Sequence, residues 1–257
     1  MKGFLFTRLP FVVIDADLPV IPASDIKTFV DYEVNSAPYD HWMLRGSSAS
    51  LAGKLAGRML TPQSDAPTYL SAHVVIDGHT GKGLLTDLTD SAAQSMAIII
   101  KRPADIPLSK LQLIFGAIDA GTGSTGYFEG IGAGSVMTCN LRGWSGSVKK
   151  PSLRLPGVAG DWMFLAVSES SGLGSSTGTV FAGGSADGNS ATLTQPLNKS
   201  LTSRKLGLGS AYLAGGLGLN LEVAEFILWD RALSVADLED VYGRAKERMT
   251  GRGLTLV

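Results

Sequence analysis

The sequence predicts an all-β protein, a jelly-roll sandwich of two antiparallel sheets with a short C-terminal helix. Short apolar runs rich in β-branched and aromatic residues recur along the 257 residues, and each reads as a strand. The 32 glycines cluster between these runs, as turns between many strands require. Amphipathic helical spacing is clearest near the C-terminus, after the last of these runs.

The domain organisation divides the chain into an N-terminal arm, residues 1–38, and the sandwich, residues 39–257. Between residues 15 and 40 the chain has six acidic residues against Lys27 alone, together with several prolines. Two interpretations stay open: the arm closes over an edge of the sandwich, or it docks onto another subunit. Extended Pro-rich segments with apolar side chains can add a strand to a partner.

The strands of the sandwich follow from apolar runs that are bounded by Gly, Pro and polar clusters. Expected strands are Tyr69–Ile76, Met96–Ile100, Leu111–Ile118, Tyr127–Ile131, Ser135–Leu141, Trp162–Val167, Thr179–Ala182, Ala191–Leu193, Leu206–Leu208 and Leu221–Trp229. Residues 172–178 are expected to form a flexible tip. The C-terminal run Leu254–Val257 is expected to pair with Phe11–Ile14 or with a neighbouring chain.

The final helix is expected at residues 234–250. Ser234 and Asp237 form the Ser-x-x-Asp variant of a capping box, in which each side chain bonds the other residue's backbone N–H. Leu238, Val241, Ala245 and other apolar residues follow at helical spacing, so one face is predicted to pack on the sandwich.

The end of the chain resembles a known family. Val223–Ser234 is similar to the last strand of concanavalin A-like, laminin G-like jelly rolls, in which a strand with a Glu runs into a polar-Arg-Ala-Leu-Ser turn and a short helix. Gly160–Val167 and Thr179–Gly184 resemble two earlier strands of that family. The resemblance covers roughly residues 69–249. It implies the fold and a structural role for Glu225, and fold alone does not give function.

Bulk composition excludes several classes. The net charge of −1 gives no field that would favour nucleic acid or an acidic membrane. A single cysteine, Cys139, excludes an internal disulfide. Neither a convincing secretory signal nor a membrane-spanning stretch is expected, so the chain is predicted to be made in a cytoplasm. We expect no cofactor.

Metal and phosphate sites are not expected either. His41, His73 and His79 lack the spacing of a zinc site and are interpreted as structural. The loop 119–126 is Gly-rich, but it precedes a strand, not the helix N-terminus that cradles phosphate. Asp119 in this loop leaves open whether a calcium ion is bound, although no array of acidic ligands accompanies it.

Candidate ligand contacts are two loop aromatics, Trp144 and Tyr212. Trp144 stands among Gly and Ser residues, and such exposed aromatic faces can stack on sugars. The alternative is that both rings fold back onto the core. Cys139 is interpreted as a small core residue.

Catalytic residues are not apparent. Glycan hydrolases of this shape place carboxylates alternately along one strand. Glu222 and Glu225 are three residues apart, which in a regular strand puts them on opposite faces.

Three hypotheses for the function follow. The first is a non-enzymatic structural and binding module of an assembled particle, a bacteriophage virion protein of the tail or capsid surface. It would form homo-oligomers, bind other virion subunits through its arm and contact host-surface glycan. The second is a free carbohydrate-binding protein, and the third is a polysaccharide-degrading enzyme.

Overall fold

The computed structural model describes residues 32–117, 122–131, 134–141, 150–209, 212 and 216–257. Asp31–Val257 forms one compact unit, distinct from Met1–Val30. All pairs of named strands in this unit are antiparallel, and they form two facing sheets, so the predicted all-β two-sheet sandwich is confirmed. Phe11–Ile14, Asp119 and Trp144 lie outside the described residues.

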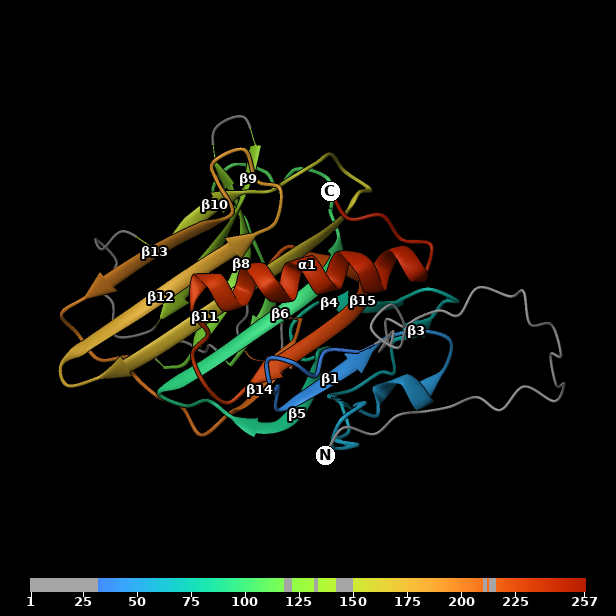
Figure 1. The fold of residues 1–257 in the computed structure, drawn as a ribbon, viewed down its shortest axis with the longest axis horizontal. Helices are drawn as coiled ribbons and strands as arrows, with labels where there is room; N and C mark the ends of the chain where they lie inside the picture. Colours follow the sequence, from blue (N-terminus) through green and yellow to red (C-terminus); the bar gives the residue numbers. More distant parts are fainter. Residues whose placement is uncertain (1–31, 118–121, 132–133, 142–149, 210–211, 213–215) are drawn as a thin grey trace, which may run out of the picture. The chain divides into compact units, whose positions relative to one another are not determined.

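The first sheet has the strand order β13-β12-β11-β6-β15-β4-β3, with β1 also paired to β15 (Figure 1). Long apolar strands occupy its centre, because residues buried on both faces need not alternate with polar ones. Its strands are β1 (Asp40–Met43), β3 (Thr68–Tyr69), β4 (Val74–Gly78), β6 (Ala93–Lys101), β11 (Trp162–Gly172), β12 (Ser175–Ala182), β13 (Ser190–Gln195) and β15 (Gly218–Trp229).

The second sheet has the order β10-β9-β8-β7-β14-β5-β2. The predicted hairpin around Gly134 is present as the β8–β9 pair. The strands are β2 (Thr61–Pro62), β5 (Leu84–Thr89), β7 (Leu111–Gly116), β8 (Ser124–Ile131), β9 (Gly134–Leu141), β10 (Ser152–Arg154) and β14 (Lys205–Leu208), and a short 3-10 helix, η2 (Ser48–Leu51), follows β1.

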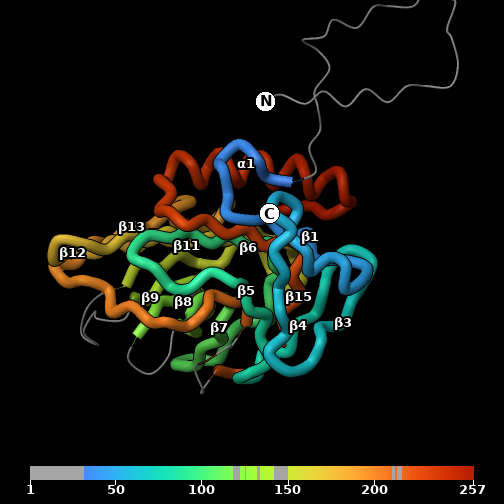
Figure 2. Tube along the Cα trace, turned by 90° about the horizontal axis from the view of Figure 1, so that it is seen from below, coloured from blue at the N-terminus to red at the C-terminus, as the bar shows by residue number. Residues whose placement is uncertain are grey.

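Two apolar layers hold these elements together. One lies between the sheets and includes Trp42, Ile98 and Phe226, all buried. The other lies between the first sheet and α1 (Val235–Gly251), where Tyr242 packs its ring on Phe164 and Phe181. Figure 2 shows the resulting stack of helix and two sheets.

The predicted start of the helix is confirmed. Ser234 Oγ accepts a hydrogen bond from the backbone N–H of Asp237, and the Asp237 carboxylate accepts one from the N–H of Ser234. Within the described residues, no helix combines the length and apolar character needed to cross a membrane.

Two local predictions are wrong. Tyr69–Ile76 is not one strand, because Ser71 and Ala72 turn the chain and β3 folds back onto β4. Residues 172–178 are not a flexible tip. Leu173 and Gly174, with φ of +52° and +80°, make a two-residue turn that continues the β11–β12 ladder to its end, as hairpins with left-handed turn residues do.

The C-terminal run is held by this same chain. Leu256 forms a parallel bridge with Trp162, and the Tyr242 hydroxyl donates a hydrogen bond to the Val257 carbonyl at 3.0 Å. The final residues therefore fasten the end of α1 to the first sheet.

Candidate ligand-binding site

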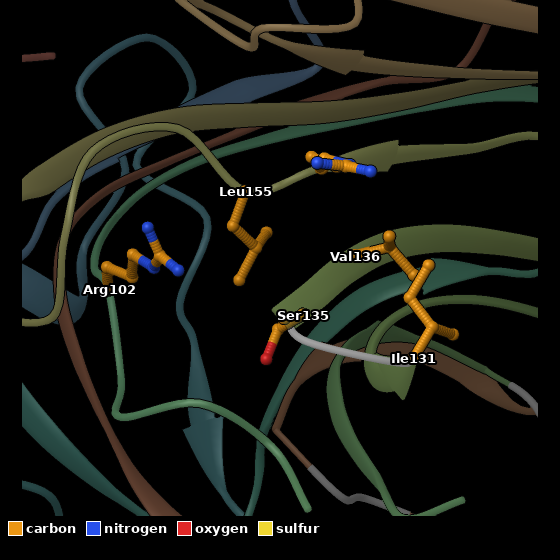
Figure 3. Close-up of a pocket in the computed structure, with 7 residues that line it drawn as sticks. Arg102, Ile131, Ser135, Val136 and Leu155 are labelled. Carbon is orange, nitrogen blue, oxygen red and sulfur yellow. The ribbon is translucent and has the colours of Figure 1, made fainter. Parts of the chain in front are cut away.

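A pocket of about 240 Å³ lies at the β10 edge of the second sheet. Figure 3 shows Arg102, Leu155 and Ser135 around one side of the hollow, with Val136 and Ile131 on the other. Arg154, at the end of β10, also lines it. The wall therefore combines two guanidinium groups with aliphatic side chains.

Backbone contacts around Ser135 fix the shape of the pocket. The buried Ser135 hydroxyl accepts a hydrogen bond from the Ile106 N–H at 2.8 Å, and its carbonyl accepts one from Leu155 N–H at 3.1 Å. Gly130 completes the arrangement, since a Cβ there would lie 2.3 Å from the carbonyl oxygen of Ile106. Glycine thus lets the 106–107 segment approach β8.

The two arginines differ in exposure and in the partners they already have. Arg102 is only 12% exposed, and its guanidinium donates to the carbonyls of Pro156 and Gly157 and to Asp105 at 3.0 Å. The Arg154 side chain is 72% exposed, and its Nε lies 3.7 Å from the Asp187 carboxylate, which also accepts a hydrogen bond from the Arg154 backbone N–H at 3.2 Å. Among the described residues that line the pocket, none is acidic. Guanidinium groups bind carboxylates in a planar, often bidentate geometry, so the pocket is suited to a small acidic ligand with an apolar face.

Tyr212, the described member of the two aromatic candidates, is half-buried and packs against the core between the sheets. The Arg204 guanidinium lies 4.6 Å from its ring centroid, and burial raises the pKa of its hydroxyl. One face of the ring is therefore already occupied by a cation. Whether either aromatic contacts a glycan stays a prediction.

The sequence carries no signal for the pocket itself. Arg102 follows β6 and Arg154 ends β10, and each is an ordinary charged residue at the end of an apolar run. Only the packing of the segment after β6 against the β8–β9 hairpin brings them together.

Glu222 and Glu225 lie on the same face of β15, so the prediction of opposite faces is wrong. Val223 pairs with Ile100 and Glu225 with Ile99, which leaves Ala224 as the extra residue of a β-bulge. Both carboxylates consequently face outward. Glu222 bonds Lys101 at the sheet's rim, whereas Glu225 is buried beneath α1.

Glu225 belongs to a buried ion network under the helix. Its carboxylate accepts from Arg248 Nη2 at 2.6 Å, and Arg248 Nη1 also contacts Glu33 Oε2 at 3.1 Å. Arg244 Nε binds Glu33 at 2.9 Å. Burial alone would raise the pKa of Glu225, but His41 and Arg248 outweigh it and lower that pKa to about 2.

The other predicted structural residues also have partners. His41 Nδ1 accepts a hydrogen bond from Glu33 N–H at 2.7 Å, and His73 lies 2.9 Å from Glu222. In the described parts of the chain, no three His, Cys, Asp or Glu side chains form a metal-binding group. Burial raises the pKa of Cys139, which disfavours the thiolate a nucleophile needs.

Comparison with known proteins finds the same fold in solved structures. No family model matches the sequence, and neither does any curated protein. The chain is similar to the solved receptor-binding domain of botulinum neurotoxin D, with a TM-score of 0.54, 12% identity and coverage of 82% of this chain and 53% of that one.

Two further solved structures give the same picture. The receptor-binding domain of botulinum neurotoxin type G has a TM-score of 0.52 and 11% identity, and covers 81% of this chain and 51% of its own. The serotype D ligand-binding domain in complex with N-acetylneuraminic acid has a TM-score of 0.52 and 13% identity, with the same coverage. The chain spans about half the length of these structures, and at such low identity the likeness establishes a shared β-sandwich fold.

Proposed function

We propose that this chain is a non-enzymatic β-sandwich module that binds an acidic glycan and is part of an assembled particle. The observation that carries the binding proposal is the pocket in which Arg102 and Arg154 face an aliphatic wall with no acidic residue among its described lining. A sugar carboxylate would meet the exposed guanidinium of Arg154, since that of Arg102 already donates to Asp105 and two carbonyls, and the apolar face of the ring would meet Leu155.

Two of the similar structures support this choice of ligand. One was solved with N-acetylneuraminic acid and another, from botulinum neurotoxin DC, with SialylT. Sialylated glycans carry the carboxylate that the pocket is suited to bind. The burial of Glu225 beneath Arg248 supports a non-enzymatic role, because that carboxylate is not accessible to a sugar.

Replacing Arg154 by alanine is expected to weaken binding of a sialylated oligosaccharide at least about tenfold, because a charge-assisted hydrogen bond contributes roughly 1.5–3 kcal/mol. The asialo counterpart should bind the parent protein weakly. The measurement is titration calorimetry with both oligosaccharides.

Arg58→Ala is the matched control, because Arg58 also forms a partly exposed ion pair, with Asp87, away from the pocket. Trp144→Ala and Tyr212→Ala test the aromatic candidates. Loss of binding only in these two variants would place the glycan site at the loop aromatics and not at the Arg102–Arg154 pocket. Absence of binding to any acidic glycan by the parent protein would overturn the proposal.

The proposed particle is a bacteriophage virion, in which the chain forms homo-oligomers at the tail or capsid surface. The support is the acidic, Pro-rich arm, whose described end is anchored to α1 through Glu33 and to Trp229 of β15 through Ser36. The protein would be made in the host cytoplasm.

Removal of residues 1–31 is expected to abolish incorporation into particles and leave the sandwich folded, because Glu33 and its contacts remain. Mass spectrometry of purified particles, beside circular dichroism of the truncated chain, measures both outcomes. Particles that retain the truncated chain, or that lack the full-length one, would contradict this part of the proposal.

A further inference from the structure

Three charged side chains are enclosed between the two sheets. Lys199 Nζ lies 2.5 Å from Asp90 Oδ1 and 3.2 Å from Glu169 Oε2, and the side chains of all three have no solvent exposure. Asp90 follows β5, Glu169 lies in β11, and Lys199 lies between β13 and β14. A lysine, an aspartate and a glutamate thus meet in a dry interior.

Neighbouring polar groups hold the two carboxylates in place. Asp90 Oδ1 accepts from Gln94 Nε2 at 3.0 Å, and its Oδ2 accepts from the Thr202 N–H at 3.1 Å. Glu169 Oε1 accepts from Gln94 Nε2 and from the Ser124 hydroxyl, both at 2.6 Å. The relative placement of Lys199 and Asp90 is therefore fixed by contacts with elements of both sheets.

The cluster is costly as a set of ions. Two carboxylates and one ammonium leave an excess negative charge in the interior, and removing charges from water is unfavourable even when they pair. Joining Lys199 to Asp90 would remove one positive and one negative charge together. The neutral amide would leave Glu169 without the ammonium at its Oε2, while its Oε1 would keep the hydrogen bonds from Gln94 and Ser124.

We propose that Lys199 and Asp90 form an intramolecular isopeptide bond, with Glu169 as the group that moves the protons. Close, fixed placement of two reactants replaces a bimolecular encounter. A buried lysine amine is an effective nucleophile once it loses its proton. The donors on Asp90 would stabilise the oxyanion of the tetrahedral intermediate.

The reaction balances without any other reactant. Glu169 takes a proton from the Lys199 ammonium, and Nζ then attacks Asp90 Cγ. The new Nζ–Cγ bond forms as one Cγ–Oδ bond breaks. Two of the three ammonium hydrogens leave with that oxygen as water, the third remains on the amide nitrogen, and Glu169 returns to its initial state.

The bond would join two of the connections that cross between the sheets. The chain passes from the second sheet to the first between β5 and β6, where Asp90 lies, and back between β13 and β14, where Lys199 lies. A covalent link between these connections would prevent the sheets from separating at this end. This chain, with its single cysteine, has no internal disulfide to do the same.

The test is intact-mass spectrometry of the denatured full-length protein. The expected mass is that of the encoded chain less one water. Trypsin would then leave segment 83–101 joined to segment 155–204, because cleavage after a modified Lys199 is blocked. A denatured mass equal to that of the encoded chain would overturn the proposal and identify the cluster as an ion network only.

Glu169→Gln keeps both reactants and is expected to show the full encoded mass, as is Lys199→Met. Lys101→Met is the matched control, because Lys101 forms an ion pair with Glu222 at 3.0 Å but is 35% exposed. This control should still lose one water. Water loss that persists in Lys199→Met would overturn the assignment of Lys199 as the amine of the bond. The mass measurement does not require this variant to fold.

Discussion

Replacement of Arg248 by methionine is expected to destabilise the folded chain by about 3–5 kcal/mol, because it leaves buried carboxylates without their cation. Arg248 is 4% exposed and contacts both Glu225 and Glu33. Methionine retains most of the aliphatic volume, so the loss reports the charge. Urea unfolding at neutral pH measures it.

Lys101→Met serves as the comparison, since it removes a lysine from the Glu222 ion pair at the edge of the same face. Both partners of that pair are 35% exposed, and such pairs contribute only about 0–1 kcal/mol. Equal losses in the two variants would contradict the view that burial makes the Arg248 network important.

The sequence predicted those elements whose apolar pattern or capping residues match the burial and hydrogen bonds they have in the fold. The run Leu221–Trp229 is apolar with no Gly or Pro, and it became the centre of the first sheet. The Ser234–Asp237 capping box lies within four successive residues, so no tertiary contact was needed to recognise it.

Predictions failed where one residue changes the geometry. The extra residue Ala224 reverses the alternation of β15, and a period of two cannot reveal a bulge in advance. The Gly- and Ser-rich composition of residues 172–178 suggested a flexible tip. The tight hairpin turn there depends on a positive φ at Leu173, which leucine rarely adopts, so the sequence did not indicate it.

The two candidate sites were hidden for a related reason. Arg102 and Arg154 reach one pocket, and Lys199 reaches Asp90, only through pairing of distant strands. In the sequence Lys199 stands after a Pro-containing loop and reads as a solvated charge. Its burial follows from the crossing between sheets, which no local pattern encodes.

Acidification is expected to destabilise the fold by roughly 3 kcal/mol between pH 4.5 and pH 2, through Glu225. The pKa of this carboxyl falls from an ordinary 4.5 to about 2 on folding. A lowered folded-state pKa means that the unfolded chain binds the proton more tightly. The stabilisation is therefore complete above pH 4.5 and declines as the pH falls toward 2.

Glu33 acts in the same direction. Burial would raise its pKa, but hydrogen bonds from Arg244 and Ser36 lower it, so protonation also weakens its hold on α1. Urea unfolding at pH 7, 4.5 and 2.5 measures the combined slope. Glu225→Gln should be less stable at pH 7 and lose part of that slope, because an amide does not titrate. An unchanged slope in this variant would show that the acid sensitivity of the fold resides in other carboxylates, and that the network under α1 holds its geometry regardless of charge.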